Sequence, residues 1–258
     1  MHHIFIKENE INIDENRIVV SAGSDNYNHI VNALRVKKGE LVLCSVEPFA
    51  FSFDYKTKVE EINVKNIVLD IEEKVKLREL PVKINLYQGI TKFDKLEFII
   101  EKAVELGVYS VNIVAMDYSI VKFDREKIKS RKDRFEKIAK SAAEQSKRGM
   151  VPFINIFDSF NDIITNNKND SNILFYENAN DINVTRKTIN ELKNDLVKDN
   201  FKNMINIYIG PEGGFSKKEI ESVEKSNFKI LTLGNRILRT ETAAITALSI
   251  MMYEFENI

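Results

Sequence analysis

From residue 82 onward, short apolar segments alternate with longer segments that have the 3.6-residue periodicity of a helix. The apolar segments predict strands at 84–88, 108–115, 153–156, 173–176, 205–209 and 230–233. The clearest periodic segments predict helices at 94–106, 125–147 and 241–255. Strands that alternate with helices favour a parallel sheet covered by helices on both faces. We therefore expect an α/β fold for this part of the chain.

The predicted helix 94–106 shows this pattern most clearly. Its apolar residues recur at spacings of three and four, which places them on one face of a helix. Gly107 follows as a C-terminal stop. The apolar face consists of Leu96, Ile99, Ile100, Ala103 and Val104.

The first 75 residues have a different texture. Short β-type segments are separated by turn-prone Asn, Asp and Gly positions, as in a small barrel or sandwich. One segment, 28–36, has helical spacing, and the charged segment 72–81 ends in a proline. We expect two domains, 1–75 and 76–258, with the boundary in this charged segment. The predicted strands of the first domain are 4–6, 17–20, 41–46, 51–62 and 67–71.

Composition excludes several classes of protein. Cys44 is the only cysteine, which rules out an intramolecular disulfide and a thiolate zinc site, and which fits a reduced, cytoplasmic setting. The three histidines all lie near the start of the chain, so we expect no metal site, and only His29 to be available to a hydrolase nucleophile. No apolar segment approaches the roughly 20 residues that span a bilayer, and no secretory signal is expected.

Positive charge is concentrated in the segment 122–148. It contains eleven Lys or Arg and five Asp or Glu, an excess of six positive charges, although the whole chain has a formal charge of −1. Such a segment is suited to contact phosphates. The alternative is a solvated helix face with interleaved charge pairs. The sequence leaves both interpretations open.

Ligand sites on parallel sheets lie beyond the carboxyl ends of the strands, and two segments there are unusual. The first, IGPEGGFSKKEIE at 209–221, is a glycine-rich turn. Ser216 and Glu219 have the spacing of a capping box and predict a helix from Lys217. Neither the P-loop pattern nor the dinucleotide fingerprint is satisfied. The turn either allows a ligand to approach the backbone closely or only reverses the chain.

The second segment, LGNRILRTETAAITAL at 233–248, has Arg236, Arg239 and Glu241 between a predicted strand and the last helix. Helix N-termini favour anions, and two arginines strengthen that preference. The sequence predicts either an anionic ligand at this helix start or a capping and ion-pair cluster.

Together and in this order, the two segments resemble the RsmE family of the SPOUT superfamily of methyltransferases, which methylates N3 of a uridine in small-subunit ribosomal RNA. Further segments are similar to the same family, namely HIVNALRVKKGE (29–40), QGITKFDKLEFIIEKAVELGV (88–108) and SAAEQSKRGMVP (141–152). The chain departs from the family at CSVEPFAF (44–51), which lacks an Asp-Gly-x-Gly turn, at Ala115 in place of a proline and at Tyr118 in place of an arginine.

The resemblance implies a PUA-like, RNA-binding β-barrel at 1–75 and a trefoil-knotted α/β domain at 76–258 that forms a homodimer. A knot could not be inferred from pattern, since knots are nearly absent from proteins. The cofactor implied is S-adenosylmethionine and the partner is 16S ribosomal RNA or the small ribosomal subunit. The implied cofactor residues are Tyr176, Glu177, Ile209, Gly210, Gly213, Gly214, Leu233, Gly234, Ile237 and Leu238. The implied RNA contacts are His29, Arg35, Lys37, Arg125 and Arg148.

Three residues are the catalytic candidates. Methylation requires loss of the uracil N3 proton, and the charge that develops spreads onto the flanking carbonyl oxygens. Arg239 is expected to stabilise that charge, while Glu241 or Glu212 orients Arg239 or relays the proton. The Arg-Thr-Glu-Thr segment at 239–242 replaces the Asn-rich segment of 2′-O-methylating relatives, which favours base methylation. The alternative is a non-catalytic RNA-binding ribosome-assembly factor with the same fold.

Overall fold

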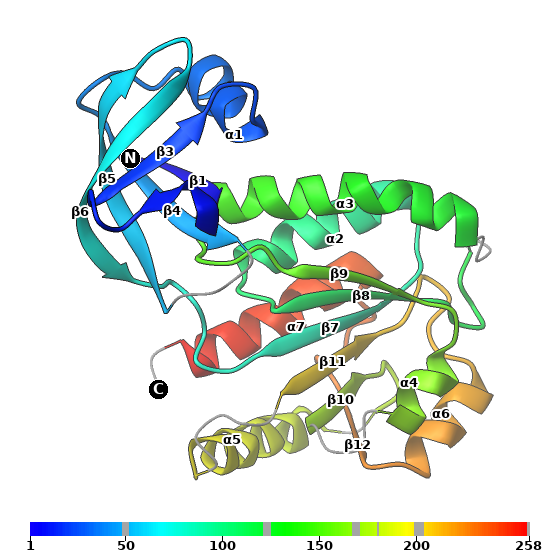
Figure 1. Ribbon diagram of the computed structural model, residues 1–258. Helices are drawn as coiled ribbons and strands as arrows, with labels where there is room; N and C mark the ends of the chain where they lie inside the picture. The colour runs from blue at the N-terminus through cyan, green and yellow to red at the C-terminus, as the bar shows by residue number, and fades with distance from the viewer. Residues whose placement is uncertain (48–51, 121–124, 167–170, 180, 199–203, 257–258) are drawn as a thin grey trace. The chain divides into compact units, whose positions relative to one another are not determined.

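The computed structural model describes residues 1–258 except 48–51, 121–124, 167–170, 180, 199–203 and 257–258 (Figure 1). Contacts between Cα atoms divide the chain into two units. The N-terminal unit comprises Met1–Glu79 and Ala143–Val151, and the C-terminal unit comprises Leu80–Ala142 and Pro152–Ile258. Each unit is described by itself.

The C-terminal unit is built on a six-stranded sheet in the order β12-β10-β11-β7-β8-β9. Every strand pair in this sheet is parallel, as the alternating pattern predicted. Each strand lies within a few residues of its predicted position. The strands are β7 (Ile84–Gly89), β8 (Ser110–Val114), β9 (Phe153–Phe157), β10 (Ser171–Phe175), β11 (Ile205–Ile209) and β12 (Phe228–Leu231).

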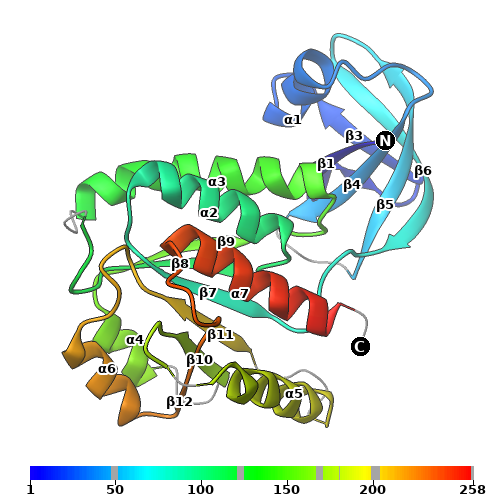
Figure 2. The same cartoon turned by 180° about the vertical axis from the view of Figure 1, so that it is seen from behind.

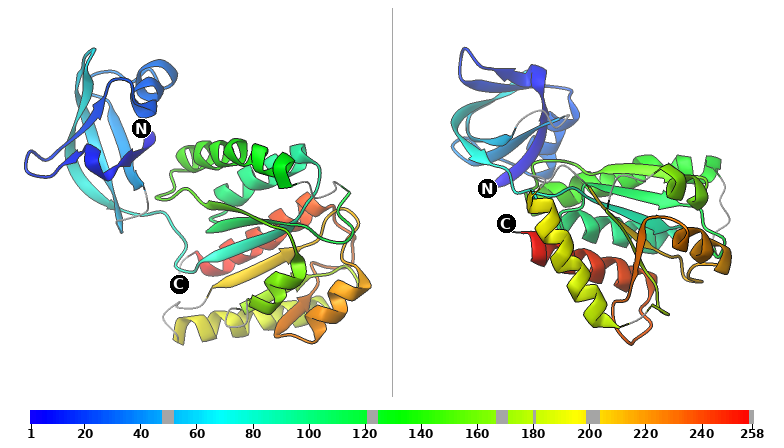
Figure 3. Two further views of the ribbon diagram at one scale, coloured as in Figure 1. Left: turned by 45° about the vertical axis from the view of Figure 1, so that its right-hand side comes forward. Right: turned by 90° about the horizontal axis from the view of Figure 1, so that it is seen from below.

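Helices cover both faces of this sheet. Helices α2 and α7 run side by side across one face, whereas α4 and α6 lie on the opposite face (Figures 2 and 3). The predicted apolar face of 94–106 is buried in α2 at all five positions, and Gly107 ends this helix with a φ of 86°. The helices are α2 (Phe93–Glu105), α3 (Arg125–Ser146), α4 (Phe160–Asn166), α5 (Ile182–Lys198), α6 (Lys217–Glu224) and α7 (Thr240–Phe255).

A row of polar side chains crosses the parallel sheet, and we call it the asparagine ladder. Its members lie near the amino ends of neighbouring strands and share one face because the strands are in register. Each hydrogen-bonds the next through side-chain atoms at 2.7–2.9 Å. The members, in order, are Asn172, Asn206, Asn85, Ser110, Asn112 and Asn155. All but Asn155 are buried, so the ladder satisfies polar groups that burial would otherwise leave without partners.

The N-terminal unit contains a second six-stranded sheet, in the order β1-β4-β5-β6-β3-β2. Its pairs are antiparallel except for β1 with β4. The strands are β1 (His2–Lys7), β2 (Ile11–Asn12), β3 (Arg17–Ser21), β4 (Leu41–Glu47), β5 (Phe53–Ile62) and β6 (Asn66–Lys76). A 3-10 turn, η1 (Glu8–Glu10), precedes β2. All five predicted strands are present, while the two-residue β2 was not predicted.

Two boundaries in this unit differ from the sequence prediction. Strand β6 continues to Lys76, so the first half of the charged segment 72–81 is strand, because pairing with β5 satisfies its backbone. The predicted helix 28–36 begins earlier, with α1 (Asp25–Asn28) and then a π-helical turn, η2 (His29–Ala33). It begins there because the Ser24 hydroxyl accepts a hydrogen bond from the Tyr27 N–H.

The interior of the N-terminal unit holds a histidine that the sequence analysis set aside. Nε2 of His3 lies 2.8 Å from the Ser45 hydroxyl, which donates to Oδ1 of Asp54 at 2.5 Å. All three side chains are buried. The expectation that only His29 could lie beside a nucleophile is therefore wrong. The serine here separates the histidine from the aspartate, whereas hydrolase chemistry needs the aspartate to orient the histidine.

Candidate active site

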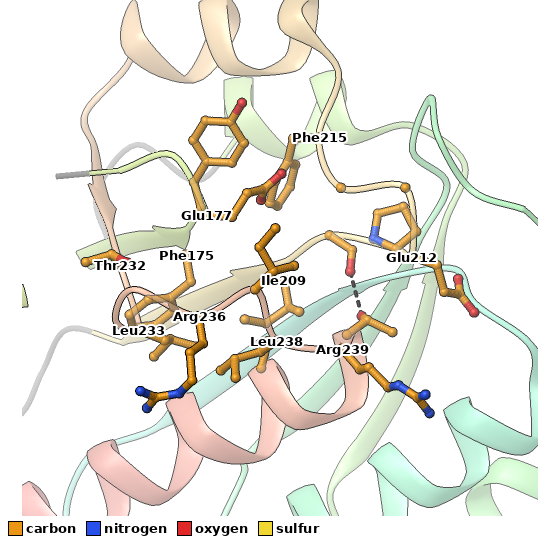
Figure 4. A pocket seen from close by; sticks show the side chains of 18 of the residues that line it. Phe175, Glu177, Ile209, Glu212, Phe215, Thr232, Leu233, Arg236, Leu238 and Arg239 are labelled. Atoms are coloured by element: carbon orange, nitrogen blue, oxygen red, sulfur yellow. Dashed lines mark hydrogen bonds between the residues drawn. The ribbon is translucent and has the colours of Figure 1, made fainter.

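Three loops of the C-terminal unit meet at the carboxyl ends of β10, β11 and β12 and enclose a pocket of about 360 Å³ (Figure 4). This volume lies in the range of small-molecule sites, roughly 300–1,000 Å³. The pocket brings together all ten residues that the resemblance implied for the cofactor. It is also lined by Lys95, Phe175, Pro211, Glu212, Phe215, Thr232, Arg236, Arg239, Thr240 and Ala243.

The loop after β11 has the local structure that its sequence predicted. The Ser216 hydroxyl accepts from the Glu219 N–H at 3.2 Å, and the Glu219 carboxylate accepts from the Ser216 N–H at 2.7 Å. This capping box starts α6 at Lys217. Gly214 has a φ of 71°, a conformation that side chains disfavour. The loop is therefore an ordered turn, and its residues 210–215 line the pocket.

The glycines of the pocket have different reasons for lacking a side chain. A Cβ at Gly213 would lie 2.8 Å from Cβ of Tyr118, so this glycine is required by a neighbouring segment of the protein. A Cβ at Gly234 would meet nothing within 4 Å, although its φ of 120° itself favours glycine. Close approach of a ligand to the backbone is therefore open at Gly234, whereas packing already accounts for Gly213.

A buried hydroxyl ties two of the pocket loops together. Thr240 donates to the Gly210 carbonyl at 2.6 Å and accepts from Nε2 of Gln88 at 2.9 Å (Figure 4 shows the first bond). Helix α7 begins at Thr240, as predicted to within one residue, but no side chain caps it. Gln88 was not among the predicted site residues. The available signal was a polar residue at the end of the apolar strand 84–88.

A charged cluster lies at one side of the pocket. Nζ of Lys95 is 3.5 Å from Glu212 and 3.3 Å from Glu241, so both predicted carboxylates pair with Lys95 and neither pairs with Arg239. The predicted roles of the two glutamates, to orient Arg239 or to relay the proton, stay predictions. Sequence reasoning also did not assign Lys95 a role, although it is the second lysine of the Lys-x-x-Lys segment at 92–95.

Glu212 is held in its charged form. Burial by itself raises its pKa, but hydrogen bonds from Thr91 and from the backbone N–H groups of residues 92 and 212, together with the charge of Lys95, outweigh burial. The pKa of Glu212 is lowered as a result. A carboxylate with a lowered pKa is a weak proton acceptor.

Two arginines line the pocket at its surface: Arg239, the predicted catalytic residue, and Arg236. The side chains of Arg236 and Arg239 are both exposed while they line it. In the part of the chain that the structure describes, neither forms an ion pair. Both guanidinium groups are therefore available to a ligand or to RNA.

The residues predicted to contact RNA differ in their exposure to solvent. Arg35 and Lys37 are exposed, and Arg35 has a φ of 53°, unusual for a residue with a side chain. His29 lies 3.5 Å from Glu144. Arg148 is only 2% exposed and forms a fork with Glu79, so its assignment as an RNA contact is not supported. The side chain of Arg125 lies outside the described residues.

Two arginines of the basic helix α3 are engaged by neighbouring side chains of the protein. Arg134 pairs with Glu97 through two nitrogens at 2.5 and 2.6 Å, and the Arg131 guanidinium lies 4.9 Å from the centre of the Phe93 ring. These contacts support the interpretation of a solvated face with charge pairs for this stretch.

Comparison with known proteins identifies the family. The sequence model of a family described as RNA methyltransferase domain matches residues 78–252. A ribosomal RNA small subunit methyltransferase E of Bacillus subtilis (strain 168) is 32% identical over 261 residues, which cover 99% of this chain and 98% of that protein. The chain belongs to the ribosomal RNA small subunit methyltransferase E family. The predicted membership of an RNA methyltransferase family is thereby confirmed.

Solved structures agree with this family in fold. A crystal structure described as that of a hypothetical protein has a TM-score of 0.83 at 30% identity and covers 98% of both chains. A family member from Neisseria gonorrhoeae, solved bound to S-adenosyl methionine, has a TM-score of 0.78 at 24% identity and covers 99% of this chain and 98% of its own. The predicted α/β class, with a small sheet preceding a parallel sheet, is confirmed.

The described residues hold neither a membrane-spanning helix nor a metal-binding cluster. Within the described ranges, no helix is both long enough and apolar enough to cross a bilayer. Among the same residues, no three His, Cys, Asp or Glu side chains gather in a way that would hold a metal ion.

Proposed function

We propose that this protein transfers a methyl group from S-adenosylmethionine to N3 of a specific uridine in 16S ribosomal RNA, in the cytoplasm. One observation carries the proposal beyond family membership. A pocket formed by three loops at the carboxyl ends of parallel strands has an exposed arginine, Arg239, on its lining, without an ion-pair partner in the described part of the protein. That arrangement provides a cofactor site with a cation beside it.

The residues of the pocket fit this cofactor. Phe175, Ile209 and Leu238 form apolar surface suited to a purine ring, and Gly234 leaves its backbone open to close approach. The backbone groups of Leu233 and Leu238 would hold adenine and ribose, and Glu177, which lies beside Gly214, provides a carboxylate for hydroxyl groups. When bound, S-adenosylmethionine supplies an electrophilic methyl group on a positively charged sulfur.

Arg239 would supply the main catalytic effect. When uracil N3 loses its proton, negative charge gathers on the neighbouring carbonyl oxygens. That charge is consumed as N3 takes up the methyl group, while the carbon–sulfur bond would break and release a neutral thioether. A guanidinium that donates to one of those oxygens stabilises the transition state more than the ground state. The N3 proton passes to water in this proposal, because Glu212 is a weak acceptor and Glu241 is engaged by Lys95.

The finer features of fold and assembly are also proposals. We propose that residues 1–75 form a PUA-like barrel that docks RNA with Arg35 and Lys37, and that residues 76–258 form a trefoil-knotted domain. Two copies of that domain would form a homodimer. Light scattering of the purified protein measures the oligomeric state, and a monomer at micromolar concentration would contradict the dimer.

The decisive experiment is methylation by the purified protein. Small ribosomal subunits and free 16S RNA from cells that lack the gene are incubated with labelled S-adenosylmethionine, and the modified nucleoside is mapped by mass spectrometry. We expect one 3-methyluridine, at a single position. Binding of the cofactor without methylation of either substrate would favour the alternative, a non-catalytic assembly factor. Methylation at a ribose oxygen would overturn the proposed chemistry.

A further inference from the structure

One lysine of the pocket contacts two glutamates from separate segments. Lys95 lies in the first turn of α2, Glu212 in the loop after β11 and Glu241 in the first turn of α7. The ammonium is 3.5 Å from Glu212 and 3.3 Å from Glu241, so a single charge bridges three elements. Lys95 and Glu212 also line the pocket itself.

The cluster is sheltered from water and carries more negative than positive charge. The side chains of Lys95, Glu212 and Glu241 are 26%, 16% and 17% exposed. Ion pairs with this degree of burial interact more strongly than exposed pairs, because solvent screens them less. Two carboxylates and one ammonium leave a net charge of about −1, and Oε2 of Glu212 is buried with no hydrogen-bond partner in the described structure. The cluster can therefore still attract a cation.

A second cation, Arg239, lies on the pocket lining. Figure 4 shows the side chains of Arg239 and Glu212 extending to the same side of the pocket. Guanidinium groups form forked pairs with carboxylates readily. If Lys95 did not occupy the two glutamates, either of them would compete with substrate for Arg239.

We propose that Lys95 is a positioning residue: by holding Glu212 and Glu241, it keeps the guanidinium of Arg239 available to the substrate. This inference rests on the proposed function of Arg239 in methyl transfer. It assigns Lys95 no contact with the reacting atoms. Its effect passes through the two glutamates, and this makes it separable from a direct role.

The first test removes the charge of Lys95 and keeps an unbranched side chain of similar length. Lys95→Met should lower the single-turnover rate by about 10- to 100-fold, the range for loss of one hydrogen bond from a charged group. Cofactor affinity should change little. The matched control is Lys102→Met on the same helix, where Lys102 also contacts two glutamates, Glu101 at 2.7 Å and Glu105 at 2.8 Å. That control should behave like the parent, and a parent-like rate for Lys95→Met would overturn the proposal.

The second test frees Arg239 from the two glutamates in a variant that still lacks Lys95. Adding Glu212→Gln and Glu241→Gln to Lys95→Met removes the competing charges and should recover most of the lost rate. A direct contact of Lys95 with RNA or cofactor, or a merely structural role, predicts no recovery. Failure of the triple variant to recover, while it keeps the parent's melting temperature, would therefore overturn the proposal. Lys95→Arg should keep more activity than Lys95→Met.

A third readout needs neither cofactor nor RNA. Phenylglyoxal modifies accessible guanidinium groups, and mass spectrometry of peptides reports its reaction at Arg239. Arg239 should react in the parent, be protected in Lys95→Met and react again in the triple variant, while Arg236 reacts equally in all three. Equal reactivity of Arg239 throughout would overturn the proposal even if the protein methylates RNA. If the parent does not methylate RNA but shows this pattern, the proposed function fails and the ion-pair competition stands.

Discussion

The two ends of the parallel sheet differ in how far their buried polar side chains are hydrogen-bonded. Near the amino ends of the strands, the asparagine ladder passes hydrogen bonds from Asn172 to Asn155. At the carboxyl ends, Oε1 of Gln88 and Oε2 of Glu212 are buried with no hydrogen-bond partner among the described residues. A buried polar group lowers the stability of the fold unless it has a hydrogen-bond partner. The amino ends of the strands therefore contribute to stability, whereas the carboxyl ends keep polar atoms that a ligand can bind.

This contrast explains how one sheet can be both rigid and reactive. A satisfied network specifies strand register, because a slip of one residue would break every bond in the row. The other end then rests on a rigid base, while Oε1 of Gln88 and Oε2 of Glu212 remain without hydrogen-bond partners among the described residues. The following predictions test this division of roles, from the largest expected effect to the smallest.

Arg239→Ala should separate chemistry from stability at the pocket end. Loss of a donor that acts on the transition state costs on the order of 3 kcal/mol, roughly a hundredfold in single-turnover rate. Cofactor affinity and the free energy of unfolding should stay near the parent values, because Arg239 is exposed. Arg239→Lys should recover little, since lysine lacks the planar fork. Arg236→Ala is the matched control, and a larger loss there would transfer the role to Arg236.

Asn206→Ala should have the opposite profile. Asn206 is fully buried at the centre of the ladder, and its removal leaves the Asn85 amide without its main acceptor. The free energy of unfolding should fall by about 2 to 3 kcal/mol, the cost of an unsatisfied buried group. Asn155→Ala, at the exposed edge of the ladder, should cost less than about 1 kcal/mol. Equal losses measured by urea unfolding would show that the ladder is not cooperative.

Thr240→Val tests the hydrogen bonds that the Thr240 hydroxyl forms beside the pocket. The variant keeps the shape but loses the hydroxyl between Gly210 and Gln88. Calorimetry should detect a fall in cofactor affinity of about five- to tenfold, equivalent to roughly 1 kcal/mol for one hydrogen bond. Thr240→Ser, which keeps the hydroxyl, should bind nearly as the parent does. Unchanged affinity in the valine variant would mean that the two loops keep their places without this bond.

The N-terminal unit holds a buried polar network, His3–Ser45–Asp54, that is titratable, unlike the ladder. Burial raises the pKa of Asp54 from 3.8 to about 6, partly opposed by the hydrogen bond from Ser45. Its contribution to stability is present at low pH and is lost as the pH rises from about 4 to 6. Burial lowers the pKa of His3 from 6.5 to about 4, so its contribution is lost as the pH falls over much the same range. The two effects oppose each other.

Removing either group should therefore uncover the other. In Asp54→Asn the unfolding free energy should rise between pH 4 and 6.5, and in His3→Gln it should fall between pH 4 and 6. Changes of about 1 to 3 kcal/mol are expected, because a pKa shift of one unit corresponds to about 1.4 kcal/mol. Amide exchange in β4 and β5 measures this unit separately. Slopes of the same sign in both variants would contradict the assigned protonation states.

The sequence alone predicted the parallel sheet, nearly all of its strands, the α2 face and the capping box at Ser216, since these depend on periodicity and local hydrogen bonds. It also placed two of the pocket loops at one edge, because strands that run parallel end there, whereas the third loop came only from the resemblance to the family. Arg148 shows the limit of such reasoning: its charge is plain in the sequence, but its burial against Glu79 depends on a residue 69 positions away. Only tertiary structure brings Lys95 to Glu212 and Glu241, or His3 to Ser45. Side chains that are distant in sequence but in contact produce no periodic pattern in the sequence. Their contacts depend on how whole helices and strands pack, and not on the local chain.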